Sequence, residues 1–213
     1  SFREQPDDAD QPGALLASPV YDIAYVGAIA TTRGVMELLA AADQLSAKRP
    51  LRLAMAGRFM PGSLQAEAHR QPGCKCVDFL GWTSHGEVRQ LLKRSRIGVV
   101  PLHPLPRYVE SQPVKLFEYM AAGIPVVASD FPRWREIVDG AGCGLLVPPE
   151  DPAALADAIG WLLDHPEEAA AMGCRGREAA EQLYSWEQEA VKLTRFYEEV
   201  LGTTDRLSRR RAA

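Results

Sequence analysis

The sequence lacks the features that mark several large classes of protein. Its 213 residues contain no apolar run as long as the ~18–20 residues that a membrane-spanning helix needs. The first residues, SFREQPDDADQPG, have no apolar stretch of the kind found in a secretory signal peptide. The net charge of −4 and the pI of about 5.6 argue against a nucleic-acid-binding protein. The overall composition, 46% hydrophobic and 24% charged, is typical of a globular domain.

Cysteine and histidine are sparse and scattered along the chain. The four cysteines include no C-x-x-C pair, and the four histidines form no local cluster with metal-ligand spacing. We therefore expect reduced thiols, a cytoplasmic protein and no metal site.

Two common phosphate-binding fingerprints are also absent. The loop after the first apolar run, GAIATTRG at 27–34, matches neither G-x-G-x-x-G nor G-x-x-x-x-G-K-[ST]. This loop therefore does not indicate a dinucleotide site. It leaves one basic side chain, Arg33, at the start of a helix, where it either binds a phosphate or stays solvated.

The sequence does contain a regular alternation of apolar runs and amphipathic segments. The apolar runs, interpreted as strands, lie at 23–27, 51–57, 76–80, 97–102, 125–128 and 144–147. Helices are expected at 34–45, 63–69, 84–93 and 114–122, and three more follow, one from Asp151 onward and two at 166–182 and 186–201. This order predicts an α/β fold, a doubly wound six-stranded parallel sheet of Rossmann-like type with extra helices at the carboxyl end. Ligands of such sheets bind beyond the carboxyl ends of the strands.

The two ends of the chain differ from its middle. Residues 1–19 are polar and contain three prolines, which predicts a linker or a disordered end. Residues 20–201 predict one folded domain. Residues 202–213 carry four arginines and predict a basic flexible tail, which is either solvated or in peripheral contact with anionic lipid at the inner face of a membrane.

The most informative stretch is ESQPVKLFEYMAAGIPVVASD, which begins at residue 110. Ser111 is expected to cap a helix that starts at Pro113, and a helix N-terminus beyond a strand is a ready anion site. Lys115 would lie in the first turn, where a cation costs about 0.3–1 kcal/mol unless an anion is bound nearby. Two interpretations stay open, since Lys115 could bind a phosphate or form a surface pair with Glu118.

Four further side chains have two interpretations each. Glu110 and Glu118 fit either a glycosidase-like acid–base pair or acceptors for sugar hydroxyls. Arg58 follows the second strand and is either a phosphate ligand or a lone surface arginine. Trp82 follows the third strand and either stacks on a base or covers the edge of the sheet.

Taken together, these segments resemble the carboxyl-terminal domain of the retaining glycosyltransferases of family 4, also called group 1, which have the two-Rossmann-domain GT-B fold. The matching segments, in the family's order, are YVGAIATTRGVMELLAAA, LAMAG, VDFLGWTSHGEVRQLLKRS, IGVVPL, ESQPVKLFEYMAAGIPVVAS and EIVDGAGCGLLVPPEDPAALADAI. They cover about residues 20 to 201, and the most specific of them is the E-x7-E element followed by AAGIPVVAS.

The resemblance implies roles for the residues of the E-x7-E element. Glu118 is expected to hold the ribose hydroxyls of a nucleotide sugar, and Glu110 to contact the donor sugar. The backbone amides of Pro113, Val114 and Lys115 are expected at the diphosphate.

The resemblance also implies roles outside that element. Arg33 occupies the position of a phosphate-binding lysine, Gly27 opens the nucleotide loop, and Trp82 lies where the nucleobase sits. The family often has an arginine directly after this glycine, whereas this chain has Ala28. The missing phosphate contact would come from Lys115 or Arg58. The catalytic candidates are thus Glu110, Arg33 and Lys115.

The function implied by the resemblance is that of half an enzyme. The chain is expected to bind a UDP-, GDP- or ADP-sugar for retaining transfer without an essential metal, while an amino-terminal domain that binds the acceptor is missing from these residues. No nucleophile is evident. Two alternatives are a sugar-nucleotide epimerase-like domain and a non-catalytic module that binds nucleotide sugars. Nucleic acid is not an expected partner.

Overall fold

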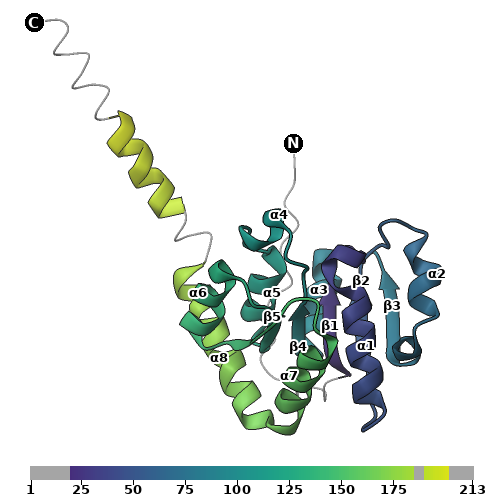
Figure 1. Cartoon of the computed structure of the whole chain (residues 1–213). Helices are drawn as coiled ribbons and strands as arrows, with labels where there is room; N and C mark the ends of the chain where they lie inside the picture. The colour runs from purple at the N-terminus through teal and green to yellow at the C-terminus, as the bar shows by residue number, and fades with distance from the viewer. Residues whose placement is uncertain (1–19, 185–189, 202–213) are drawn as a thin grey trace, which may run out of the picture.

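The computed structural model describes residues 20–184 and 190–201. Within them, six strands form one sheet (Figure 1). The strands are β1 (Tyr21–Val26), β2 (Leu53–Ala56), β3 (Val77–Gly81), β4 (Ser95–Val100), β5 (Val126–Ser129) and β6 (Gly144–Val147).

The sheet has the strand order β3-β2-β1-β4-β5-β6, and every neighbouring pair is parallel. Ile23 in β1 pairs with Leu53 on one side and with Ile97 on the other, so β1 is central. This order is that of a doubly wound Rossmann-like sheet, whose direction of winding reverses between β1 and β4. The predicted fold class is confirmed, and the expected ligand site lies at the carboxyl ends of β1 and β4.

Helices cover both faces of the sheet (Figure 1). They are α1 (Val35–Ser46), α2 (Leu64–His69), α3 (His85–Lys93), α4 (Pro106–Val109), α5 (Val114–Ala122), α6 (Pro132–Ala141), α7 (Pro152–Asp164) and α8 (Pro166–Leu183), with short 3-10 helices η1 (Thr31–Arg33) and η2 (Pro72–Cys76). Buried residues of α1 and α7 form the core on one face, and those of α3, α5 and α6 form the core on the other.

The alternation of side chains along each strand explains these two cores. In β1, Ile23 and Tyr25 face the α1–α7 side, while Ala24 faces the α5–α6 side, and all three are fully buried. Successive residues of a strand point to opposite faces, so a strand covered on both sides must be apolar throughout. Burying a large apolar side chain contributes about 1.5–3 kcal/mol.

Two helices beside the candidate site were missing from the sequence prediction. Helix α6 begins with Pro132 and buries Trp134, Ile137 and Val138, a spacing typical of an amphipathic helix that the sequence analysis overlooked. Helix α4 is a single turn, too short to show periodicity. In contrast, the predicted cap of α7 is confirmed, because the Asp151 carboxylate accepts hydrogen bonds from the Ala153 and Ala154 amides.

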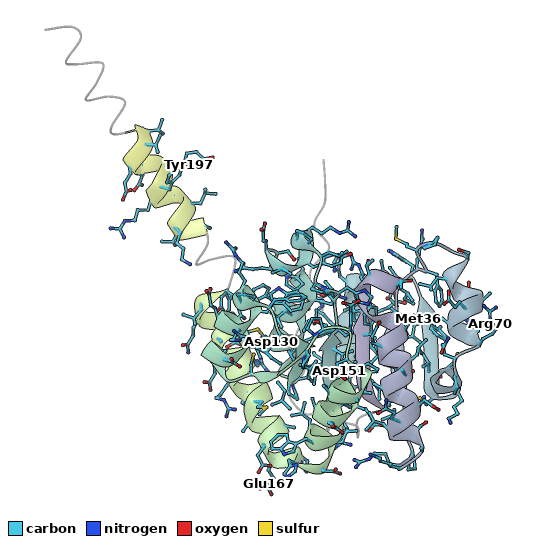
Figure 2. The ribbon with its side chains drawn as sticks, in the orientation of Figure 1. Met36, Arg70, Asp130, Asp151, Glu167 and Tyr197 are labelled. Atoms are coloured by element: carbon cyan, nitrogen blue, oxygen red, sulfur yellow. The ribbon has the colours of Figure 1, made fainter. Side chains whose placement is uncertain are left out.

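The predicted linker at 1–19 and the basic tail at 202–213 lie outside the described residues. Residues 190–201, part of the helix predicted at 186–201, are helical, and Tyr197 on this segment is exposed (Figure 2). Among the residues that the structure describes, no helix combines the length and the apolarity needed to cross a membrane.

Candidate nucleotide-sugar site

A cavity of about 430 Å³ opens at the carboxyl end of β1, between η1 and the start of α5. We name it the β1–α5 cavity. Six of the residues that line it were predicted as site residues: Gly27, Arg33, Pro113, Val114, Lys115 and Glu118. The switch point of the sheet therefore brings together residues that are far apart in the sequence.

A second cavity, of about 300 Å³, continues past the ends of β2 and β3. We name it the Trp82 cavity. Its lining includes Arg58 and Trp82, and it shares Gly27 and Glu118 with the β1–α5 cavity. A third cavity, of about 410 Å³ between α3 and α5, also contains Glu118 in its lining. Glu118 therefore borders all three cavities.

Backbone geometry places Arg33 at the β1–α5 cavity. Gly34 has φ +70°, and a Cβ there would lie 1.7 Å from the Pro101 carbonyl oxygen. Only glycine combines this left-handed conformation with so close an approach to another backbone. The turn fixes the end of η1, so that Arg33 reaches Gly27, where an added Cβ would lie 3.4 Å from Arg33 Nη1.

The amine of Lys115 is buried beside Arg33, which corrects the interpretation of a surface Lys115–Glu118 pair. Lys115 is only 7% exposed, and its Nζ lies 4.2 Å from the centroid of the Tyr25 ring. Within the part of the chain that the structure describes, Nζ has no hydrogen-bond partner. A Cβ on Gly27 would lie 3.5 Å from Nζ, so Arg33 and Lys115 flank the same point of the cavity.

The buried face of α5 explains why the surface interpretation was wrong. Val114 is 72% exposed, whereas Leu116, Tyr119 and Met120 are fully buried. Lys115 precedes Tyr119 by four residues and therefore shares its inward-facing side of the helix.

The environment of Lys115 disfavours its charged form. Burial, together with the neighbouring Arg33 cation, lowers the pKa of Lys115 to about 7, although Glu118 opposes both effects. An ammonium group without an acceptor, next to a guanidinium, is costly in a desolvated site. Among residues 20–184 and 190–201, neither Arg33 nor Lys115 forms an ion pair with a carboxylate, although Glu118 lies near enough to act on the Lys115 amine.

Helix α5 is anchored to the centre of the sheet by Tyr119. Its hydroxyl accepts a hydrogen bond from the Val26 amide at 3.0 Å and donates one to the Val99 carbonyl at 3.4 Å. Gly98 leaves room for the ring, because a Cβ there would lie 2.4 Å from it. These contacts hold Lys115 and Glu118 at fixed positions relative to β1.

The start of α5 differs from the prediction in two respects. Ser111 does not cap the helix, since its hydroxyl donates to the Tyr108 carbonyl at 3.0 Å and Pro113 takes the N-cap position without a side-chain bond. Pro113 also has no amide hydrogen, so of the three predicted donors only Val114 and Lys115 can donate. Their N–H groups belong to the first turn, which has no intrahelical acceptors.

A residue that is distant in the sequence holds the loop before α5. The Trp134 indole, fully buried in α6, donates a hydrogen bond of 2.7 Å to the Ser111 carbonyl. This contact was not predicted, because α6 itself was not predicted.

Glu110 is the one predicted site residue that lines neither the β1–α5 cavity nor the Trp82 cavity. It is exposed and forms the C-cap of α4. The structure therefore does not place the carboxylates of Glu110 and Glu118 in one cavity, as an acid–base pair would require.

The remaining two predicted residues lie on the rim. Trp82 is 67% exposed and lines the Trp82 cavity, so it does not cover the sheet edge. Arg58 is exposed at the same cavity. Across residues 20–184 and 190–201, no group of three or more His, Cys, Asp or Glu side chains is arranged to hold a metal ion.

The fold and these two cavities define an α/β domain with a cleft at its switch point that is lined by the basic side chains of Arg33 and Lys115. Residues 21–165 match the family of group 1 glycosyl transferases. The chain belongs to this family, which confirms the resemblance found in the sequence.

Individual relatives agree with this assignment. The chain is 29% identical over 182 residues to the MMP alpha-(1->4)-mannosyltransferase of Mycolicibacterium hassiacum, covering 84% of this chain and 43% of that protein. The chain thus spans less than half the length of that relative.

Solved structures share the fold. The C-terminal domain of a glycosyl transferase group 1 family protein from Francisella tularensis has a TM-score of 0.67 at 21% identity, covering 79% of this chain and 88% of that one. Anabaena HepE, in complex with UDP and glucose, has a TM-score of 0.66 at 21% identity, covering 84% and 49%.

Proposed function

We propose that this chain is the donor-binding half of a retaining glycosyltransferase and that it binds a nucleoside diphosphate sugar across the two cavities. The observation that carries the proposal is the pair of Arg33 and buried Lys115, which forms no ion pair within the described residues and lies beside the amides at the start of α5. A diphosphate supplies both the negative charge and the acceptor oxygens that this site lacks.

In this arrangement the diphosphate occupies the β1–α5 cavity and the nucleoside extends into the Trp82 cavity. Glu118, which borders both, accepts hydrogen bonds from the ribose hydroxyls. The exposed indole of Trp82 stacks on the base, with Arg58 beside it. Glu110 would contact the sugar from the end of α4, which requires that the donor sugar project out of the cavity toward it.

The contribution of these residues to catalysis is electrostatic. When the bond from the sugar to the diphosphate breaks, negative charge builds up on the departing oxygen. Two fixed cations and two backbone donors at that point stabilise this charge more than they stabilise the bound substrate. Lys115 takes the place of the arginine that the family often has at the position of Ala28. We assign no nucleophile, and both retention and independence from metal rest on the family resemblance alone.

The acceptor site belongs, in our proposal, to an amino-terminal domain outside these residues. The support is the length of the relatives, since the chain spans only 43% of the mannosyltransferase. The donor is a nucleotide sugar, with UDP-, GDP- and ADP-sugars as the candidates. Binding of UDP and glucose by Anabaena HepE, a protein of the same fold, supports testing UDP-glucose first.

We also propose a cytoplasmic location, with peripheral contact at the inner face of a membrane. The support for the first part is that the four cysteines are free. The support for the second is the basic composition of residues 202–213.

A thermal-shift screen with UDP-glucose, GDP-mannose and ADP-glucose tests the proposal. A ligand present at about 100 times its Kd adds ~2.7 kcal/mol of stability, which raises the Tm of a domain of this size by about 5–10 °C. Arg33→Gln should abolish most of the shift. Arg70→Gln removes the same charge from an exposed side chain at the C-cap of α2 (Figure 2) and should leave the shift unchanged. No shift with any donor, or equal losses in both variants, would contradict the proposal.

A further inference from the structure

The groups around the amine of Lys115 come from β1, η1 and α5. Arg33 approaches from η1, the Tyr25 ring from β1, and Glu118 and Tyr119 from its own helix. Burial raises the pKa of Tyr25 and of Tyr119 well above the ordinary value, so both are neutral near pH 7. One cation and one carboxylate therefore act on Lys115.

The geometry leaves the charged amine unsatisfied. An ammonium group has three N–H donors, but Nζ has no hydrogen-bond partner, and the ring of Tyr25 offers only its face at 4.2 Å. Arg33, which flanks the same point at Gly27, adds repulsion. Lys115 lines the β1–α5 cavity, so this cavity is where an acceptor for the amine can enter.

We propose that Lys115 takes up a proton from solvent when the diphosphate of a donor enters the β1–α5 cavity, so that donor binding is coupled to pH. This inference rests on the proposed function. The proton forms a fourth bond at Nζ, no other bond is made or broken, and the added positive charge is balanced by the bound anion. The phosphate oxygens then accept the hydrogen bonds of the ammonium group, which has no acceptor in the free site.

The lowered pKa of Lys115 in the free site leads to the same conclusion. Burial and Arg33 lower the pKa of Lys115 to about 7 in the absence of an anion. A diphosphate beside Nζ raises that pKa again, because an opposite charge favours the protonated form. Below pH 7 the amine is already charged, so affinity is independent of pH. Above pH 7 the amine must be protonated on binding, and the affinity falls by up to about tenfold for each pH unit.

Calorimetric titration measures the proton directly. UDP-glucose is the probe, with GDP-mannose and ADP-glucose in parallel, because a diphosphate substituted at both ends has no group that titrates near pH 7. The terminal phosphate of a nucleoside diphosphate would obscure the result, since its second ionisation lies near pH ~6. Repeating the titration in buffers with different ionisation enthalpies gives the number of protons taken up.

The expected result is close to one proton per donor at pH 8 and close to none at pH 6. Lys115→Arg stays charged at both pH values and should bind without proton uptake, with an affinity that does not change between them. Lys115→Met should bind weakly, also without uptake. Lys48→Arg alters an exposed lysine on the turn after α1 and should retain the behaviour of the parent chain.

The outcomes separate this inference from the function on which it rests. Binding at pH 8 without proton uptake, or uptake that persists in Lys115→Arg, overturns the inference and leaves the proposed function standing. If no donor binds at either pH, both are contradicted. A ligand-free check uses the ¹³C NMR signal of the methylated Lys115 amine, identified by its loss in Lys115→Arg. Titration of that signal near pH 10.5 instead of near 7 would also overturn the inference.

Discussion

Replacing Lys115 by methionine should stabilise the free protein at neutral pH. Methionine keeps the length of the side chain and removes the buried amine. The pKa of Lys115 is lowered from 10.5 to about 7 in the folded protein. Each pKa unit corresponds to about 1.4 kcal/mol, so burying the charged amine costs roughly 5 kcal/mol of folding free energy below pH 7.

The sign of the pH dependence follows from the same values. Between pH 7 and 10.5 the unfolded chain keeps the proton at Lys115 and the folded chain has lost it. The parent protein therefore gains stability relative to Lys115→Met as the pH rises through this window. Between pH 6.5 and 9 the advantage of the variant should shrink by roughly 2–3 kcal/mol.

Denaturant unfolding of both proteins at pH 6.5 and pH 9 measures this difference. All other titrating groups are common to the two proteins, so the change in their stability difference reports Lys115 alone. Lys48→Met, at an exposed lysine, should show an offset that does not depend on pH. A variant that is less stable than the parent at pH 6.5, or an advantage that stays constant with pH, would refute the reasoning.

Three further predictions concern the cleft. In calorimetry, Glu118→Ala should weaken the binding of UDP and of UDP-glucose alike by about ten- to a hundredfold, because a hydrogen bond to a charged group contributes ~1.5–3 kcal/mol. Glu110→Ala should weaken the binding of UDP-glucose only. Similar small effects of both variants on both ligands would count against these roles. Trp82→Ala should weaken nucleotide binding but shift Tm by less than about 2 °C, because the indole is 67% exposed; a large loss of Tm would make it a packing residue. Gly34→Ala should cost roughly 3 kcal/mol or more in denaturant unfolding, since its Cβ would lie 1.7 Å from the Pro101 oxygen, whereas Gly140→Ala in α6 has open space and should be neutral or stabilising.

The strands of this fold could be predicted because their apolar runs are continuous. The inner part of a strand covered on both faces is apolar, as in β2 (LAMA), and each run here ends near a polar or glycine-containing loop. Helix α4 could not be predicted, because one turn carries no period. Helix α6 could have been, from Pro132 at its start and the spacing of Trp134, Ile137 and Val138.

The sequence allowed us to predict which residues belong to the site, but not which of them are buried. Arg33 and Lys115 were expected near a phosphate because each lies at the start of a helix, and Glu118 was expected at the ribose because of the family resemblance. Which face of α5 turns inward depends on contacts across the sheet, such as the bonds from Tyr119 to Val26 and Val99. Those partners lie far away in the chain, so the helix alone left the surface pair as an equal alternative.

A crystal structure of this chain with UDP-glucose, or with whichever donor gives the largest thermal shift, would show whether a nucleotide sugar spans the two cavities. We expect diphosphate oxygens within hydrogen-bond distance of Arg33 and of Lys115 Nζ, and ribose hydroxyls on the Glu118 carboxylate. A nucleotide bound in the α3–α5 cavity or elsewhere, with the Lys115 amine still lacking an acceptor, would show that the proposed binding mode is wrong.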